Sequence, residues 1–139
     1  MPIKNYTTKI SAHKTVGEIT GILAEHGAKR IAQDYDNGKV VAVCFVIDTP
    51  FGEQAVRLPA NVEKVLKVLQ KQKVPGVDYA RAEMVAWRII KDWVDAQMAI
   101  LESEMVEMSE IFLPYIINAD GQTVYQIFEQ KQLLLGDGK

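Results

Sequence analysis

Apolar residues near the N-terminus follow two different spacings. Residues 5–10 are rich in Thr and Tyr and end in an isoleucine, which is typical of a short β-strand. After Thr15-Val16-Gly17-Glu18, which has the form of a capping box, apolar positions recur every three or four residues until Gly27. The first pattern predicts a strand over 5–10. The second predicts a helix that begins at Thr15 and ends at Gly27.

Three further segments have the composition of strands and are separated by turn sequences. Residues 30–35 and 39–48 flank Asp36-Asn37-Gly38, a sequence that favours a tight hairpin turn. A second turn at 48–52 leads into residues 53–58, so these three strands should form an antiparallel meander. The second segment is apolar at nearly every position, which predicts the central strand of a sheet that is covered on both faces.

The second half of the chain has helical spacing. Asn61 can cap a helix whose apolar positions recur to Leu69, and Val74-Pro75-Gly76 breaks the pattern. Residues 78–104 contain neither Gly nor Pro, which predicts one helix of roughly 40 Å at about 1.5 Å per residue. Short helical segments follow on either side of the loop 118–122. The expected fold is α+β, with a three- to four-stranded antiparallel meander packed against helices, one long helix at about 78–104 and short C-terminal helices.

The length of 139 residues fits one domain with one core. We expect a single α+β domain over residues 1–135 and a disordered tail over residues 136–139. No apolar run reaches the roughly 18 residues that a membrane span requires, and the N-terminal residues have no apolar leader segment. We therefore expect no membrane partner and a cytoplasmic location.

The long predicted helix is apolar over more than half of its circumference. Trp93 belongs to one apolar stripe. A second stripe beside it contains Trp87, Ile90, Val94, Met98, Leu101 and Met105. A helix of this kind packs one stripe on its own sheet and leaves the other to be covered by the C-terminal helices, by a second copy of the chain or by a stacked ligand. We predict a homo-oligomer in which the second stripe forms the interface.

Charge divides the chain into a basic half and an acidic half. Residues 1–73 hold 11 Lys/Arg against 7 Asp/Glu, whereas residues 74–139 hold 5 against 11. The overall net charge of −2 conceals this difference. Such an asymmetry is compatible with mutual attraction between the two halves, or with an acidic partner for one half and a basic partner for the other.

Basic residues in the first half form the candidate nucleic-acid-binding surface. They are Arg57, Lys64, Lys67, Lys71 and Lys73. Lysines of the expected helix fall on one outward stripe, which can follow a phosphate backbone if Lys29 and Arg30 lie nearby. The alternative is a solvated lysine face, because no aromatic residue is evident to stack a base unless Tyr6, Tyr35 or Phe51 is exposed.

Few residues suggest catalysis. His13 and His26 match no metal-binding or catalytic spacing, and Cys44, alone in an apolar strand, is expected to be a buried small hydrophobe. Phosphate-loop, dinucleotide-binding and nucleophile-elbow motifs are absent from the sequence. An acidic cluster lacks the histidines of di-metal helical sites and is expected to be a solvated face. Its members are Glu102, Glu104, Glu107 and Glu110. The sequence thus predicts a non-enzymatic binding protein that needs no metal or cofactor.

Three segments stand out as distinctive strings: GEITGILAEHGAKRI (17–31), VPGVDYARAEMVAWRIIKDWVDAQMAILESEM (74–105) and SEIFLPYI (109–116). In these segments the chain resembles a group of small uncharacterised proteins that are encoded by phages, prophages and plasmids. The resemblance covers most of the chain and assigns no functional residue. It implies a mobile-element setting, in which nucleic-acid handling and interference with host defence are common tasks.

Two hypotheses follow from these patterns. The first is an oligomeric phage-type binding protein that contacts single- or double-stranded nucleic acid, DNA or RNA, through its basic residues. The second is a phage-encoded inhibitor or sponge, whose acidic half contacts a host defence protein or which captures a small signalling molecule. An enzyme would require a deep pocket that holds His13 or His26 beside a carboxylate.

Overall fold

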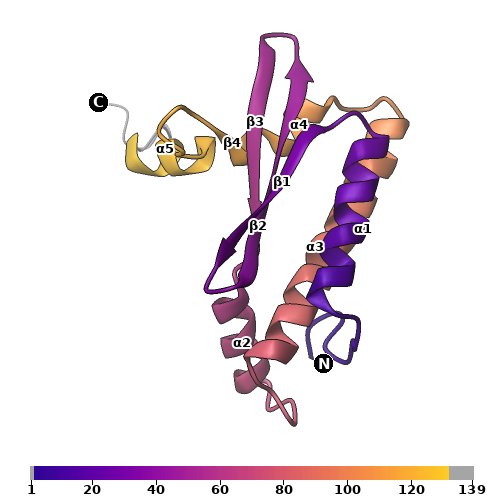
Figure 1. Ribbon diagram of the computed structural model, residues 1–139, viewed down its shortest axis with the longest axis vertical. Helices are drawn as coiled ribbons and strands as arrows, with labels where there is room; N and C mark the ends of the chain where they lie inside the picture. Colours follow the sequence, from indigo (N-terminus) through magenta and orange to yellow (C-terminus); the bar gives the residue numbers. More distant parts are fainter. Residues whose placement is uncertain (1, 132–139) are drawn as a thin grey trace.

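The computed structural model describes residues 2–131, which form an antiparallel sheet with helices packed beside it (Figure 1). The elements follow one another as α1 (Ala12–Glu25), β1 (Lys29–Asp36), β2 (Lys39–Thr49), β3 (Gly52–Pro59), α2 (Val62–Lys71), α3 (Tyr79–Glu102), α4 (Met108–Phe112), the 3-10 helix η1 (Leu113–Tyr115), β4 (Ile116–Ile117) and α5 (Val124–Lys131). The predicted α+β class, antiparallel meander, long helix and short C-terminal helices are confirmed. The predicted tail at 136–139 lies outside the described residues.

The sheet has the order β1-β2-β3-β4, and each neighbouring pair is antiparallel. Asp36 pairs with Lys39 across the first turn, where Asn37 and Gly38 have φ angles of 53° and 76°. Left-handed backbone at both central positions is what a tight hairpin turn needs, and Asn-Gly adopts it at little cost. The hairpin predicted from these residues is therefore confirmed.

The N-terminal prediction is wrong in two respects. Residues 4–7 form a turn rather than a strand, with Asn5 at a φ of 66° and a 3.0 Å hydrogen bond from the Thr8 N–H to the Asn5 carbonyl. Helix α1 begins at Ala12 rather than at Thr15, because the Ser11 side chain accepts the Lys14 N–H at 3.1 Å and caps the helix one turn earlier.

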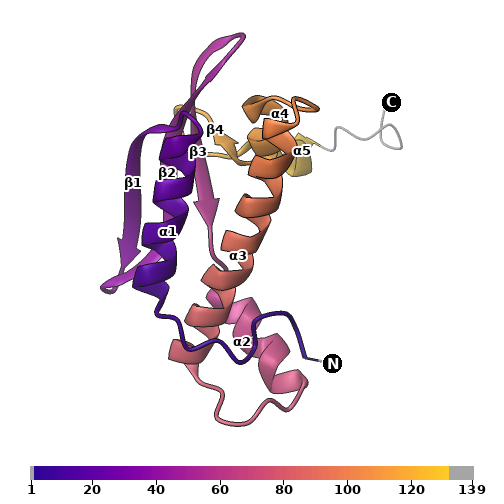
Figure 2. The same ribbon diagram turned by 90° about the vertical axis from the view of Figure 1, so that its right-hand side faces the viewer.

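Helices α1 and α3 run side by side and cover one face of the sheet (Figures 1 and 2). On β2, Val43, Phe45 and Ile47 point to this face and are buried, whereas Cys44 and Val46 alternate with them and are only half-buried. The helical layer therefore covers one face, whereas the other face is covered only in part, since Ala42 is fully buried there but Cys44 and Val46 are not, and the predicted cover on both faces is met only in part. Cys44 is correspondingly not the buried hydrophobe that we expected.

Aromatic packing attaches the C-terminal part of the chain to this core. The fully buried Phe112 of α4 packs edge-on against Phe45 of β2, with ring centroids 5.1 Å apart, and against Trp93 of α3 at 5.7 Å. A second cluster joins α2 to the first turns of α3 through Leu69 and Val85, which are both fully buried. Helix α3 thus contacts the sheet, α1, α2 and α4 along its length.

Ion pairs connect α1 to α3 at two levels. The Arg88 guanidinium donates to Glu18 at 2.8 Å and to the Thr15 hydroxyl at 3.3 Å. Near the ends of both helices, His26 lies 2.8 Å from a carboxylate oxygen of Glu102 through Nε2 and 2.8 Å from the Ile22 carbonyl through Nδ1. The carbonyl and then the carboxylate raise the pKa of His26, because both acceptors favour the doubly protonated ring.

Candidate nucleic-acid interface

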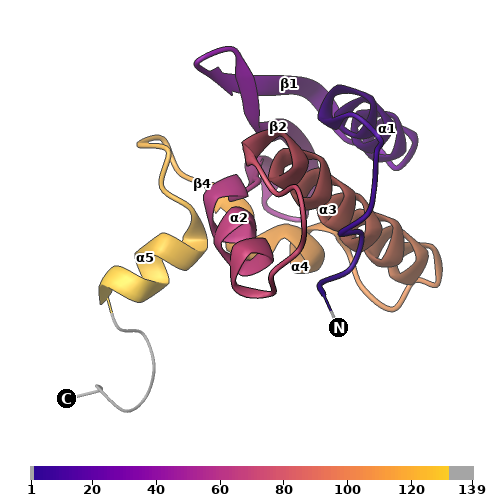
Figure 3. The same ribbon diagram turned by 90° about the horizontal axis from the view of Figure 1, so that it is seen from below.

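A cleft of about 700 Å³ opens between the end of β3, the start of α2, η1 and α5. Figures 1 and 3 show α5 standing away from the sheet, on the opposite side of β3 and α2 from α1. The side chains that line the cleft include Arg57, Asn61, Lys64, Tyr115, Tyr125 and Gln126. Two of the five predicted nucleic-acid-binding residues, Arg57 and Lys64, are thus brought to one cavity.

The cations lie on the β3 and α2 side of the cleft. Arg57 is opposite Cys44 in the strand register, and its Nε donates to Asp34 at 3.2 Å, which orients the guanidinium while leaving the terminal nitrogens available. Lys64 lies in the first turn of α2, where its backbone N–H donates to the capping side chain of Asn61 at 3.2 Å. Its ammonium is exposed at a helix N-terminus, a position that favours anions.

Aromatic rings lie on the η1 and α5 side. Tyr115 ends η1 and packs edge-on against Trp93 at 6.0 Å between ring centroids. Tyr125 is 56% exposed, and its ring stacks against Phe128 at 6.5 Å with an interplanar angle of 19°. Both tyrosines line the same cleft as the cations, although more than fifty residues separate them from Arg57 in the sequence.

The remaining predicted lysines lie outside the cleft. Lys67 and Lys71 are exposed on α2, and their spacing places them on the same side of the helix as Lys64. Lys73 is exposed just beyond the helix. The condition that Lys29 and Arg30 should join them is not met. Lys29 pairs with Asp48 at 3.2 Å and both basic residues pair with Glu53, toward the β2–β3 turn and away from α2.

The predicted oligomer stripe on α3 is mostly used within the chain. Trp87, Val94 and Met98 are buried in the hydrophobic core, and Ile90 and Leu101 pack against that core. Of the six residues, Met105 is the one that is largely exposed, at 71%. The prediction that this stripe forms a surface interface is therefore wrong, because α1, the sheet and the C-terminal segment together cover α3. Self-association itself stays a prediction.

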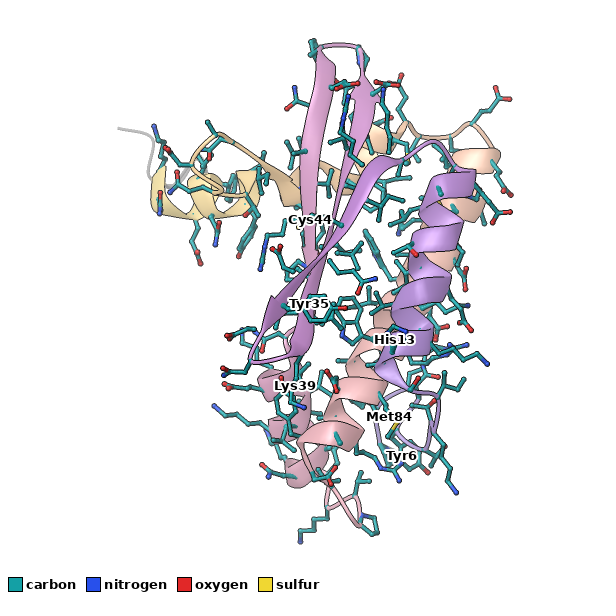
Figure 4. All side chains as sticks on the ribbon, viewed as in Figure 1. Tyr6, His13, Tyr35, Lys39, Cys44 and Met84 are labelled. Atoms are coloured by element: carbon teal, nitrogen blue, oxygen red, sulfur yellow. The ribbon has the colours of Figure 1, made fainter. Side chains whose placement is uncertain are left out.

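His13, His26 and Cys44 do not share a pocket in the part of the chain that the structure describes, but His13 and Glu83 both line one of about 310 Å³, so the absence of catalysis stays a prediction. His13 is exposed on α1, and His26 contacts Glu102 in the surface ion pair between α1 and α3. The Cys44 thiol lies on the open sheet face and donates to Asp34 at 3.5 Å (Figure 4). Partial burial, followed by the charge of Asp34, raises the pKa of Cys44, which keeps the thiol protonated and a weak nucleophile.

The acidic cluster serves local structure. Glu110 accepts the Glu107 backbone N–H at 2.9 Å and forms a reciprocal capping box at the start of α4, while Glu102 contacts His26. Among residues 2–131, no group of three or more His, Cys, Asp or Glu side chains is placed to hold a metal ion. These contacts do not single out a partner for the acidic half, and the host-protein hypothesis stays a prediction.

No protein-family model matches the chain, and comparisons with curated proteins and with solved structures return no match. The relation to small phage, prophage and plasmid proteins therefore stays a prediction. Within the described part of the chain, each helix falls short of the length or hydrophobicity that crossing a membrane requires.

Proposed function

We propose that the chain binds single-stranded nucleic acid in the cleft between β3, α2, η1 and α5. One observation carries the proposal: two cations from β3 and α2, Arg57 and Lys64, line the same cavity as two rings from η1 and α5, Tyr115 and Tyr125. Proteins that hold single strands combine these two features, because cations neutralise the phosphates while aromatic rings stack on the bases. Arg57 and Lys64 are candidates from the sequence alone, whereas Tyr115 and Tyr125 become candidates only because the fold brings them to the same cleft.

Stacking selects a single strand over a duplex. A base must leave its own stack before it can lie on a protein ring, and bases in a duplex present only their edges to the grooves. The cleft volume of about 700 Å³ is within the range of sites that enclose compact ligands. It can accept unpaired nucleotides, whereas a duplex would contact only the exposed cations along β3 and α2. Single strands should therefore bind more tightly than duplexes.

The lysine side of α2 continues the basic wall away from the cleft. For single strands, the logarithm of the binding constant falls with the logarithm of salt concentration by about 0.7 for each phosphate contact. If all five predicted cations contact phosphates the slope is about −3.5, and if only Arg57 and Lys64 do so it is about −1.4. The measured slope therefore tells whether the strand stays in the cleft or follows α2.

A charge reversal inside the cleft tests the proposal against a matched reversal elsewhere. We expect Lys64→Glu to weaken binding of a labelled single strand and to make the salt slope shallower, as measured by anisotropy at about 50 and 200 mM salt. Lys9→Glu makes the same change in net charge at an exposed residue before α1, and it should leave affinity and slope close to those of the parent. Equal losses in both variants would mean that net charge alone drives binding and would contradict the cleft.

The cavity volume also favours a second candidate, a free nucleotide-type signalling molecule that the protein would sequester. Such a ligand offers the same base and phosphate chemistry to the same residues, but it cannot extend along α2. Titration calorimetry with a mononucleotide and with a short oligonucleotide separates the two candidates. Affinity that rises with strand length supports the single strand, whereas equal or tighter binding of the mononucleotide supports sequestration.

A further inference from the structure

A second surface, independent of the cleft, lies along β1 and α1. Strand β1 is the outer strand of the sheet, and among residues 2–131 no other strand pairs with its free edge. A shallow groove of about 620 Å³ separates this strand from α1. Figure 3 shows both elements on the same side of the molecule, and Figure 4 shows Tyr35 of β1 and His13 of α1 at this groove. An unpaired strand edge beside an open groove is a surface that a further strand can extend.

Glycines form the α1 side of the groove, although the single chain does not require them. Gly17 and Gly21 occupy one side of the helix at a spacing of four residues, and a Cβ added at either position would meet nothing within 4 Å. A glycine inside a helix costs about 1 kcal/mol relative to alanine. Close approach by another backbone is a physical reason to accept that cost at two exposed positions.

The charged residues at the two ends of α1 interact unfavourably with the dipole of their own helix. The helix dipole favours acidic residues in the first turn and basic residues in the last turn. In α1 the exposed Lys14 lies in the first turn and the exposed Glu25 in the last, on the same side as Gly21, and within residues 2–131 neither forms an ion pair. A second copy of this helix, packed antiparallel, would bring each of these charges beside its opposite.

Strand β1 repeats the same order of charge. Its sequence, KRIAQDYD, is basic at the start and acidic at the end. The register with β2 shifts between Lys29 and Ala32 and again between Asp34 and Tyr35, so the regular stretch 32–34 is centred on Gln33. A two-fold axis at Gln33 would pair this stretch with its own copy. The same axis would bring the basic start of each β1 toward the acidic end of the other copy's β1.

We propose that two copies of the chain associate about a two-fold axis, with β1 antiparallel to β1 and the glycine sides of α1 packed against each other. The complementarity of charge selects a second copy as the occupant, because both elements match themselves only in the antiparallel order. Tyr35, which is 59% exposed in one chain and lies next to the paired stretch, would then lose exposed area. Pairing would also satisfy the free backbone N–H and C=O groups of the β1 edge, which otherwise favour aggregation.

Light scattering of the parent should give about 31 kDa, twice the 15.6 kDa of one chain. Lys14→Glu alone and Glu25→Lys alone should each shift the protein toward the monomer, and the double variant should restore the dimer. Each single change improves the match to the helix dipole, so loss of folding does not explain a loss of mass. Gly21→Leu should also give a monomer, whereas Ala96→Leu, on an exposed position of α3, should leave the dimer intact.

Two results would overturn this dimer. One is a parent mass of 15.6 kDa throughout the concentration range. The other is a parent dimer whose mass is unchanged by Gly21→Leu and by both single charge reversals. The scattering experiment contains no nucleic acid, so its outcome is independent of whether the cleft binds a strand.

Discussion

Replacing Tyr125 with alanine separates stacking from charge in the proposed site. The ring is 56% exposed and contacts Phe128 at the surface of α5, so its loss should change the free energy of unfolding by no more than about 0.5 kcal/mol. Stacking of one base on an aromatic ring contributes about 1 to 3 kcal/mol to single-strand binding. Tyr125→Ala should therefore weaken binding by roughly 5- to 150-fold.

The salt dependence makes this prediction specific. Tyr125 carries no charge, so the slope of log affinity against log salt should stay that of the parent, whereas Lys64→Glu should make it shallower by about 0.7 or more. Anisotropy titrations of one labelled strand at several salt concentrations measure both quantities. Tyr125→Phe should restore most of the affinity, because it keeps a ring that can stack.

A matched exposed aromatic provides the control. Phe51 is 88% exposed at the β2–β3 turn and does not line the cleft, so Phe51→Ala should bind the strand as the parent does. The reasoning is refuted if Tyr125→Ala binds as tightly as the parent, or if Phe51→Ala loses as much affinity as Tyr125→Ala. Either result would mean that the α5 side of the cleft does not stack a base.

Two further predictions concern the scaffold. Phe112→Ala should lower the free energy of unfolding by about 3 to 5 kcal/mol, because it removes a fully buried ring. Leu113→Ala, at the half-exposed neighbouring position, should lower it far less. The midpoints of urea unfolding of the two variants and the parent measure the difference. The raised pKa of His26 means that its contacts with Glu102 and the Ile22 carbonyl stabilise the fold fully below pH 6.5, and that this contribution is lost as pH rises through the folded-state pKa. The midpoint difference between the parent and Glu102→Gln should therefore shrink at alkaline pH, and a difference that grows would contradict the ion pair.

The elements that could be predicted are those whose signals are local. Asn37-Gly38 specifies a turn by its own backbone preferences, and the uninterrupted helical spacing of α3 specifies a helix without knowledge of its neighbours. The N-terminus is harder to predict because local signals compete: Ser11 and Thr15 are both good N-cap residues, but Ser11 caps the helix, whereas Thr15 is buried and its hydroxyl accepts from Arg88. Local preference has less weight than tertiary context at such positions.

The site was only half predictable for a physical reason. Charge is visible in sequence because lysines on a helix keep a fixed spacing, so Lys64 could be proposed from the pattern of α2 alone. Tyr115 and Tyr125 reach the same cavity through the packing of Phe112 and the β3–β4 pairing, and these contacts have no periodic signature. Likewise, the apolar stripe of α3 shows that Trp87 must be covered, but it cannot show that the cover comes from the same chain.

The most direct test of the account is a comparison of one labelled single strand with its duplex, each titrated with the parent protein at about 50 and 200 mM salt. The account predicts tighter binding of the single strand at both concentrations. From the lower to the higher salt concentration, affinity should fall by about 100-fold if all five cations contact phosphates, and by about 7-fold if only Arg57 and Lys64 do so. Failure to bind the single strand at the lower salt, or equal affinity for the duplex, would contradict a cleft that stacks unpaired bases.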